Sequence, residues 1–99
     1  MRLSPQQQQA IVETFLDVFG QGEIFLFGSR VDDAKRGGDI DLYVKLDHHE
    51  SVADKRMTFL ARLKRKIGDQ KIDLVVAEEP QRPIDTIAQQ QGSLLCQKH

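Results

Sequence analysis

The chain has 99 residues, of which 39% are hydrophobic and 29% charged, and its formal net charge at pH 7 is −1. This length predicts one domain, residues 1–99, with a modest hydrophobic core. A net charge near zero argues against a dedicated nucleic-acid-binding protein, which is usually basic overall. No apolar run approaches the ~20 residues of a membrane span. Because the N-terminus also lacks an apolar signal segment and Cys96 is the single cysteine, we expect a cytoplasmic protein.

The N-terminal segment has the pattern of an amphipathic helix. Ser4 followed by Pro5 is typical of a helix cap and a first helical residue. Apolar side chains then recur at helical spacing until Gly20: Ile11, Val12, Phe15, Leu16, Val18 and Phe19. The run at residues 23–27 is continuously apolar after its first residue, which predicts a strand covered on both faces.

A glycine and a serine follow this first strand directly. At Gly28, the missing side chain lets backbone N–H groups approach a phosphate, and the hydroxyl of Ser29 adds one more donor. We expect residues 29–36 to form a short helix or turn. Gly37 and Gly38 then end it, before a second strand over residues 40–45.

Two carboxylates mark the start of the second strand. Side chains alternate between faces along a strand, so Asp39 and Asp41 are predicted to share one face, with Cα atoms about 6–7 Å apart. Like charges at this distance repel by roughly 2–3 kcal/mol at an effective dielectric constant near 20. A cation offsets such repulsion, and Mg²⁺ that acts on phosphates binds one or two carboxylates together with substrate oxygens.

A third carboxylate occurs in a similar setting further along the chain. Residues 71–76 read KIDLVV, a predicted strand in which Asp73 has the same Ile-Asp-Leu context as Asp41. If the two strands are neighbours in one sheet, Asp73 can join Asp39 and Asp41 around one metal site.

A long helix is predicted between the second and third strands. Asp47 with Glu50 resembles a capping box at its start. The buried stripe is predicted to contain Ala53, Met57, Leu60, Leu63 and Ile67. The other faces are basic, with Lys55, Arg56, Arg62, Lys64, Arg65 and Lys66. A charge run of this kind favours a solvated face and leaves open a surface for an acidic or nucleic-acid partner.

The C-terminal part is predicted to contain one short helix, over residues 84–91. It is expected to bury Ile84, Ile87 and Ala88, and Gly92 is expected to end it. The apolar tail at residues 94–96 fits either a last strand or an interface. The predicted order is therefore α-β-α-β-α-β-α, which indicates an α/β sandwich.

These motifs together resemble a known family. Gly28-Ser29, nine intervening residues, Asp39-Ile40-Asp41 and a later Asp73 are similar to the DNA polymerase β-type nucleotidyltransferase superfamily. The small size and the Gly-Ser-Arg start resemble its minimal nucleotidyltransferase branch (MNT, or MntA-like). The resemblance covers roughly residues 5–95 and implies a small mixed β-sheet with flanking helices. The alternative is that Gly28-Ser29 is only a turn and that the aspartates only flank exposed strand ends. It would have to explain three such matches to the family pattern within 46 residues.

The resemblance also implies roles for individual residues. Asp39 and Asp41 would each bind two Mg²⁺ ions that bridge the phosphates of a nucleoside triphosphate and the attacking group. Asp73 would bind only the ion that activates the nucleophile and would help to remove its proton. Gly28 and Ser29 would hold the terminal phosphates. Arg30 fits a role in neutralising the pyrophosphate leaving group, and it fits equally a surface arginine at a helix start.

Two functions of different classes follow from the resemblance. The first is an enzyme that transfers a nucleotidyl group, most simply adenylyl from ATP. The second is a protein-binding module, because MNT-type proteins resemble antitoxins of HEPN-type RNase toxins, and some of these add AMP to the toxin. A chain of this size leaves little room for an acceptor-binding region, so the acceptor surface is expected from a second polypeptide or another copy of this chain. A stand-alone transferase acting on a small molecule or RNA is the remaining alternative, and the basic helix would favour RNA.

Overall fold

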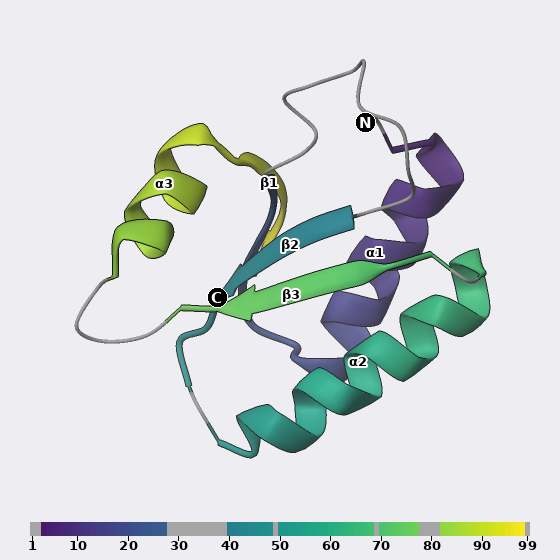
Figure 1. The fold of residues 1–99 in the computed structure, drawn as a ribbon. Helices are drawn as coiled ribbons and strands as arrows, with labels where there is room; N and C mark the ends of the chain where they lie inside the picture. Colours follow the sequence, from purple (N-terminus) through teal and green to yellow (C-terminus); the bar gives the residue numbers. More distant parts are fainter. Residues whose placement is uncertain (1–2, 28–39, 49, 69, 78–81, 99) are drawn as a thin grey trace.

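The computed structural model describes residues 3–27, 40–48, 50–68, 70–77 and 82–98. Figure 1 shows their arrangement as a small sheet with helices on both sides. The elements in chain order are α1 (Pro5–Val18), β1 (Gly22–Phe27), β2 (Ile40–Lys45), α2 (Val52–Ile67), β3 (Ile72–Val76), α3 (Pro83–Gln91) and β4 (Ser93–Lys98). None of the helices in these ranges combines the length and the apolar character needed to cross a membrane.

The four strands form one mixed sheet in the order β3-β2-β1-β4. β1 is antiparallel to both β2 and β4, whereas β2 and β3 are parallel. The mixed sheet with flanking helices confirms the predicted fold class. The tail that the sequence left open as a strand or an interface is the edge strand β4, paired with β1. The short helix or turn predicted over residues 29–36 lies outside the described residues.

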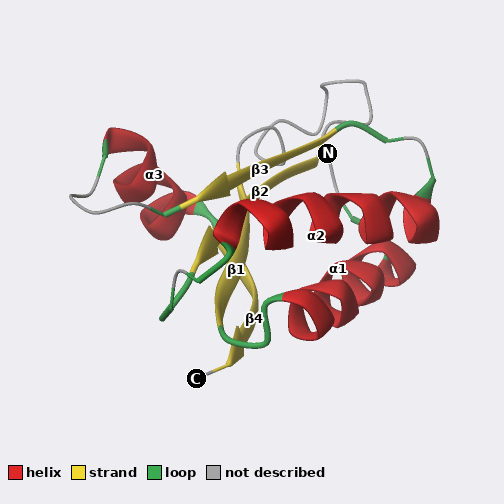
Figure 2. Cartoon of the chain, turned by 90° about the horizontal axis from the view of Figure 1, so that it is seen from below, coloured by secondary structure: helices red, strands yellow, loops and turns green. Residues whose placement is uncertain are grey.

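The two faces of the sheet are covered differently. Ile40, Leu42 and Val44 of β2 are fully buried in the larger hydrophobic cluster, together with side chains of α1 and α2. Between them, Tyr43 points to the opposite face, where it packs with Phe25 in a smaller cluster that includes an alanine of α3. α1 and α2 run side by side over the larger core (Figure 2), and α3 lies on the other side of the strands (Figure 1).

The first helix forms as its sequence predicts. The hydroxyl of Ser4 accepts a hydrogen bond from the Gln7 N–H at 3.1 Å, and the Gln7 side-chain oxygen accepts one from the Ser4 N–H at 3.0 Å. This capping box satisfies two N–H groups that a helix start otherwise leaves unpaired. Ile11 and Phe15 are fully buried, so the predicted apolar face is the one that packs on the sheet.

The predicted start of the second helix is wrong. α2 begins after Ser51, whose φ of 54° is left-handed, and its first turn has no side-chain cap. The predicted capping residue Asp47 instead donates its backbone N–H to the side-chain oxygen of Gln21 at 2.6 Å. The amide nitrogen of Gln21 also donates to the carbonyl of His48. This long-range contact holds the segment beside the start of β1, so it cannot form the first turn of α2.

The buried stripe of α2 is also rotated from the predicted one. Met57 is 68% exposed and Ala53 is exposed, whereas Phe59, which the predicted stripe omits, is fully buried with Leu63. Leu60 and Ile67 are half-buried against the same core. The ring of Phe59 packs against Phe19 of the α1 end, with centroids 5.6 Å apart. The largest apolar side chain on α2 therefore decides which face turns inward.

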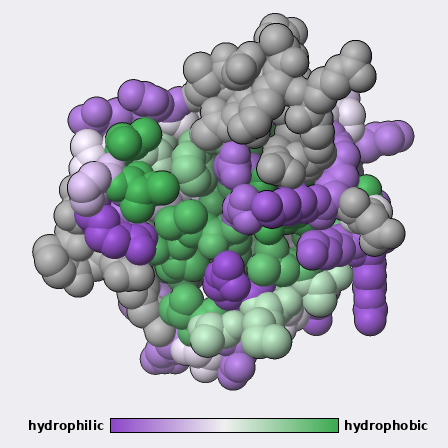
Figure 3. All heavy atoms as spheres, viewed as in Figure 1, coloured by the Kyte–Doolittle hydropathy of each residue, from purple (hydrophilic) through white to green (hydrophobic). Residues whose placement is uncertain are grey.

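α3 departs from its prediction in a similar way. Ala88 is buried as expected, but Ile84 and Ile87 are 38% and 49% exposed. The buried position beside Ala88 is occupied by Asp85, which is fully buried. Figure 3 accordingly shows green hydrophobic atoms at the surface where α3 lies. The reason is a polar network on this face of the sheet, described below.

Two arginines cover the outer edge of β3. The Ile40 N–H donates to the carbonyl of Lys71 at 2.9 Å. In this parallel ladder the backbone N–H and C=O groups of odd-numbered β3 residues therefore point toward β2, and those of even-numbered residues point away from the sheet edge into solvent or toward other groups. Of these outward groups, the Leu74 carbonyl accepts from Arg56 at 3.3 Å. The Val76 carbonyl accepts from Arg82 at 2.8 Å. These contacts satisfy carbonyls that would otherwise offer an edge for strand addition.

The observed stripe of α2 predicts unequal effects of two substitutions. Phe59→Ala should lower the free energy of unfolding by about 3–5 kcal/mol, because it opens a cavity in a fully buried site. Met57→Ala should change it by less than about 0.5 kcal/mol, because that side chain already contacts water. Urea unfolding of both variants measures the difference. Similar losses from the two substitutions would contradict the observed orientation of α2.

Candidate functional site

Two of the predicted carboxylates lie side by side in the sheet. Asp41 of β2 and Asp73 of β3 are register partners in the parallel pair. Their sequence neighbours Leu42 and Leu74 are buried in the larger core, so both aspartates are on the opposite face, the one that carries α3. Neighbouring strands are about 4.8 Å apart, which brings the two side chains together. Asp41 is half-buried and Asp73 is exposed.

The end of β1 meets the same point of the sheet. Phe27 is the register partner of Asp41 on the other side, so Phe27, Asp41 and Asp73 form one row across three strands. We refer to Asp41 and Asp73 in this row as the carboxylate row. Because β1 is antiparallel to β2, the C-terminal end of β1 and the N-terminal ends of β2 and β3 are at one edge of this face. Phe27 is the residue immediately before Gly28, so the sequence predicted to bind phosphate begins one residue beyond this row.

The other predicted site residues lie outside the described part of the chain. These are Gly28, Ser29, Arg30 and Asp39. Within the described ranges, no group of three or more histidine, cysteine, aspartate or glutamate side chains is placed to hold a metal ion. Asp41 and Asp73 are therefore the two members of the predicted triad that the structure describes.

The carboxylate pair carries an electrostatic cost. Two unit charges about 5 Å apart repel by about 3 kcal/mol at an effective dielectric constant of 20, and by less where water screens them, as at the exposed Asp73. A divalent cation between them would reverse the sign of this interaction. Carboxylate oxygens are the ligands that Mg²⁺ prefers, and Mg²⁺ commonly takes only one or two of them, with water or phosphate oxygens completing its shell. The donor set of this row thus fits Mg²⁺.

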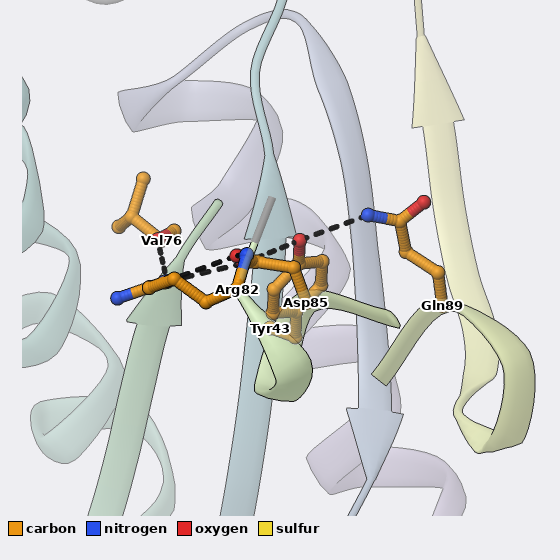
Figure 4. A network of polar contacts seen from close by, with 5 residues as sticks. All are labelled: Tyr43, Val76, Arg82, Asp85 and Gln89. Atoms are coloured by element: carbon orange, nitrogen blue, oxygen red, sulfur yellow. Dashed lines mark hydrogen bonds and ion pairs between the residues drawn. The ribbon is translucent and has the colours of Figure 1, made fainter. Parts of the chain in front are cut away.

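A buried polar network lies beside the carboxylate row (Figure 4). The Tyr43 hydroxyl donates to Asp85 Oδ1 at 2.9 Å and accepts from the side-chain nitrogen of Gln89 at 3.0 Å. The other oxygen of Asp85 accepts from the backbone N–H and the Nε of Arg82, at 2.6 and 3.0 Å. Among the described residues, no buried side-chain nitrogen or oxygen lacks a hydrogen-bond partner. The network is therefore internally complete, and it docks α3 on the sheet.

The network shifts the pKa values of two of its side chains, Asp85 and Tyr43. Hydrogen bonds from the Arg82 side chain hold the pKa of the Asp85 carboxyl well below its usual range, against the opposing effect of burial. Burial raises the pKa of Tyr43 to about 12, and the hydrogen bond from Gln89 acts in the opposite direction. At neutral pH, Asp85 is therefore ionised and Tyr43 retains its proton.

Sequence reasoning missed this network. The apolar residues of α3 were expected to face the sheet, and Tyr43 was counted only as part of a strand. One local signal exists, because Asp85, Ala88 and Gln89 share a face at helical spacing, so a charged residue lies where an apolar one is expected. Its partner Tyr43 is 42 residues away in sequence and could not be found from this signal.

Comparison with models of known protein families places the chain in a wider context. The family model described as "Polymerase beta, Nucleotidyltransferase" matches residues 10–99, nearly the whole chain. The matched region contains every strand of the sheet and both described carboxylates. A search of the curated proteins finds no match.

The carboxylate pair predicts a stability effect that depends on the cation. Without divalent cations, Asp73→Asn should raise the free energy of unfolding by up to about 1 kcal/mol, because it removes like-charge repulsion at an exposed site. Added Mg²⁺ should stabilise the unsubstituted protein more than the variant. Thermal unfolding with and without Mg²⁺ measures both effects. A variant that Mg²⁺ stabilises as much as the parent would exclude Asp73 from cation binding.

The Asp85 network predicts a loss of stability in acid. Its folded-state pKa is below the unfolded value of about 3.9, so the stabilisation is complete above that pH and is lost as pH falls below it. Asp85→Asn should lower the free energy of unfolding at pH 7 by about 2 kcal/mol or more, because it leaves buried donors without a charged acceptor. Urea unfolding at several pH values should show this difference shrinking between about pH 4 and pH 2. A difference independent of pH would contradict the ionised network.

Proposed function

The chain belongs to the polymerase β nucleotidyltransferase family, and from this premise we propose that it transfers a nucleotidyl group from a nucleoside triphosphate, ATP, with Mg²⁺ bound at the carboxylate row. The observation that supports the proposal most directly is the in-register pair of Asp41 and Asp73. Two acidic side chains on one face of the sheet, with their sequence neighbours buried in the core, form a donor set that suits Mg²⁺. The nucleotidyltransferase domain itself supports a transferase.

The carboxylates have different roles in such a reaction. Two bound Mg²⁺ ions would neutralise phosphate charge and acidify the attacking hydroxyl. In the proposed reaction, Asp39 and Asp41 would hold both cations, and Asp73 would bind the one that activates the nucleophile. Asp73 orients the attacking hydroxyl and accepts its proton, a role that suits a carboxylate that is exposed to the acceptor side. The oxygen of the acceptor then bonds to the α-phosphorus as the bond to pyrophosphate breaks.

The phosphate-binding part of the proposal falls on Gly28, Ser29 and Arg30. Backbone N–H groups at Gly28 and the hydroxyl of Ser29 would donate to the terminal phosphates. Arg30 would neutralise the pyrophosphate as it leaves. The position of Phe27 beside Asp41 supports this assignment, because these three residues follow it directly in the sequence.

We further propose that the acceptor is a protein, a HEPN-type RNase toxin, and that the chain acts as its antitoxin by AMPylation. Within the described residues, every helix and strand belongs to the sheet or to a layer that covers it. These ranges contain no additional helix or strand set apart for an acceptor, which supports a second polypeptide, or another copy of this chain, as the source of the acceptor surface. The alternative is a binding module that only occludes the toxin, but in such a module the carboxylate pair would have no chemical role.

An RNA acceptor is less well supported by the position of the basic helix. The basic side chains of α2 are exposed except for the half-buried Lys55, but α2 covers the face of the sheet opposite to Asp41 and Asp73. RNA bound along α2 would therefore have to pass around the β3 edge to reach the carboxylates. Salt-sensitive RNA binding with transfer of label to the RNA would nevertheless establish that alternative.

Transfer of label from α-labelled ATP tests the proposal. With Mg²⁺ and the protein encoded by the neighbouring gene, label should appear on that protein, and Asp41→Asn should reduce transfer at least about 1,000-fold because a cation ligand is lost. Asp54→Asn removes a carboxylate of α2, on the opposite side of the sheet, and serves as the matched control. Equal transfer by Asp41→Asn and the parent would refute the site. Tight binding to the neighbour without label would favour the occluding module.

A further inference from the structure

A continuous set of hydrogen bonds joins the two strands that carry the carboxylates. Tyr43 of β2 donates to Asp85 Oδ1 at 2.9 Å, and Arg82 donates from its NH2 group to the same oxygen at 3.1 Å. The same NH2 group of Arg82 donates to the carbonyl of Val76 at the end of β3, at 2.8 Å. Figure 4 shows Arg82 and Asp85 between the two strands. We refer to Tyr43, Asp85 and Arg82 as the clamp.

The clamp lies next to the carboxylate row on the same face. Tyr43 follows Asp41 by two residues, so the two side chains point to the same side of β2. The ring of Tyr43 also contacts Phe27 edge-on, with centroids 6.3 Å apart. Phe27 is the other register neighbour of Asp41. Tyr43 thus lies two residues from Asp41 in the same strand, and its ring contacts the residue that pairs with Asp41 in β1.

This position matters because a metal site depends on the spacing of its ligands. Asp41 and Asp73 are register partners on β2 and β3, so a shift of one strand against the other would change the separation of the two carboxylates. Mg²⁺ tolerates little deviation from octahedral geometry, with oxygens at about 2.1 Å. Side chains that orient metal ligands from a distance typically change metal affinity by about 10- to 100-fold when they are altered.

We propose that the clamp is a positioning device for the metal site. It holds the spacing of Asp41 and Asp73 at the value a divalent cation needs, and it does so without touching the cation. Tyr43 and Arg82 then determine cation affinity, in addition to docking α3. This inference rests on the proposed function, because it takes the carboxylate pair as the metal site.

Binding of Mn²⁺ alone, followed by the electron paramagnetic resonance signal of the free ion, tests the clamp. Tyr43→Phe removes one hydroxyl group and keeps the ring. The matched control is Ile11→Val, which removes one methyl group from a fully buried side chain on α1, at the opposite face. Both substitutions should lower the urea midpoint to a similar extent. Only Tyr43→Phe should weaken Mn²⁺ binding, by about 10-fold.

A second variant covers the case in which Tyr43→Phe does not fold. Arg82→Lys keeps the positive charge but lacks the planar fork that reaches both Asp85 and the Val76 carbonyl. It should weaken Mn²⁺ binding in the same direction. If either variant loses stability yet binds Mn²⁺ as tightly as the parent, the clamp is only structural and the inference is wrong.

The parent protein and Asp41→Asn separate this failure from failure of the proposed function. Mn²⁺ binding by the parent that Asp41→Asn abolishes places the cation at the carboxylate row, whatever the clamp variants do. A parent that does not bind Mn²⁺, or an Asp41→Asn variant that binds it equally well, would overturn the metal site itself and with it the clamp.

Discussion

The in-register parallel pairing of β2 with β3 is the constraint on which the rest of the structure depends. Leu42 and Leu74 are buried on one face of this pair, so a one-residue slip of either strand would turn its leucine from the core toward the other face. The same register places Asp41 opposite Asp73 on the other face. Core packing on one side of the sheet thus places two acidic side chains side by side on the other. The proposed function depends on this placement, because two neighbouring carboxylates suit a divalent cation.

The two faces of the sheet accordingly do different things. The face under α1 and α2 is apolar and includes fully buried rings such as Phe15 and Phe59, which supply hydrophobic stabilisation. The face under α3 has a small apolar cluster and a charged network around Asp85. Buried polar networks contribute little net stability, but they restrict an element to one orientation when every group is satisfied. α3 is therefore positioned chiefly by directional bonds and the sheet chiefly by packing.

The sequence was sufficient for what depends on local patterns. Apolar runs located β1, β2 and β3, and the repeated Ile-Asp-Leu context placed Asp41 and Asp73 on strands. The pairing of these two strands was only a condition of the predicted site, and the structure supplies it. Prediction from the sequence failed where a long-range contact overrode the local pattern. Gln21 holds Asp47 away from α2, and Tyr43 draws Asp85 inward in place of the apolar residues of α3. The roles of Gly28, Ser29, Arg30 and Asp39 remain predictions, since these residues lie outside the described part of the chain.

The most direct test of the account is anomalous diffraction from crystals grown with Mn²⁺ and a non-hydrolysable ATP analogue. The account predicts an Mn²⁺ peak within coordination distance of a carboxylate oxygen of Asp41, on the α3 side of the sheet, with the triphosphate bound to it and Asp73 beside it. An analogue bound on the side of α2, or an Mn²⁺ peak that contacts neither aspartate, would contradict the assignment of the carboxylate row as the active site.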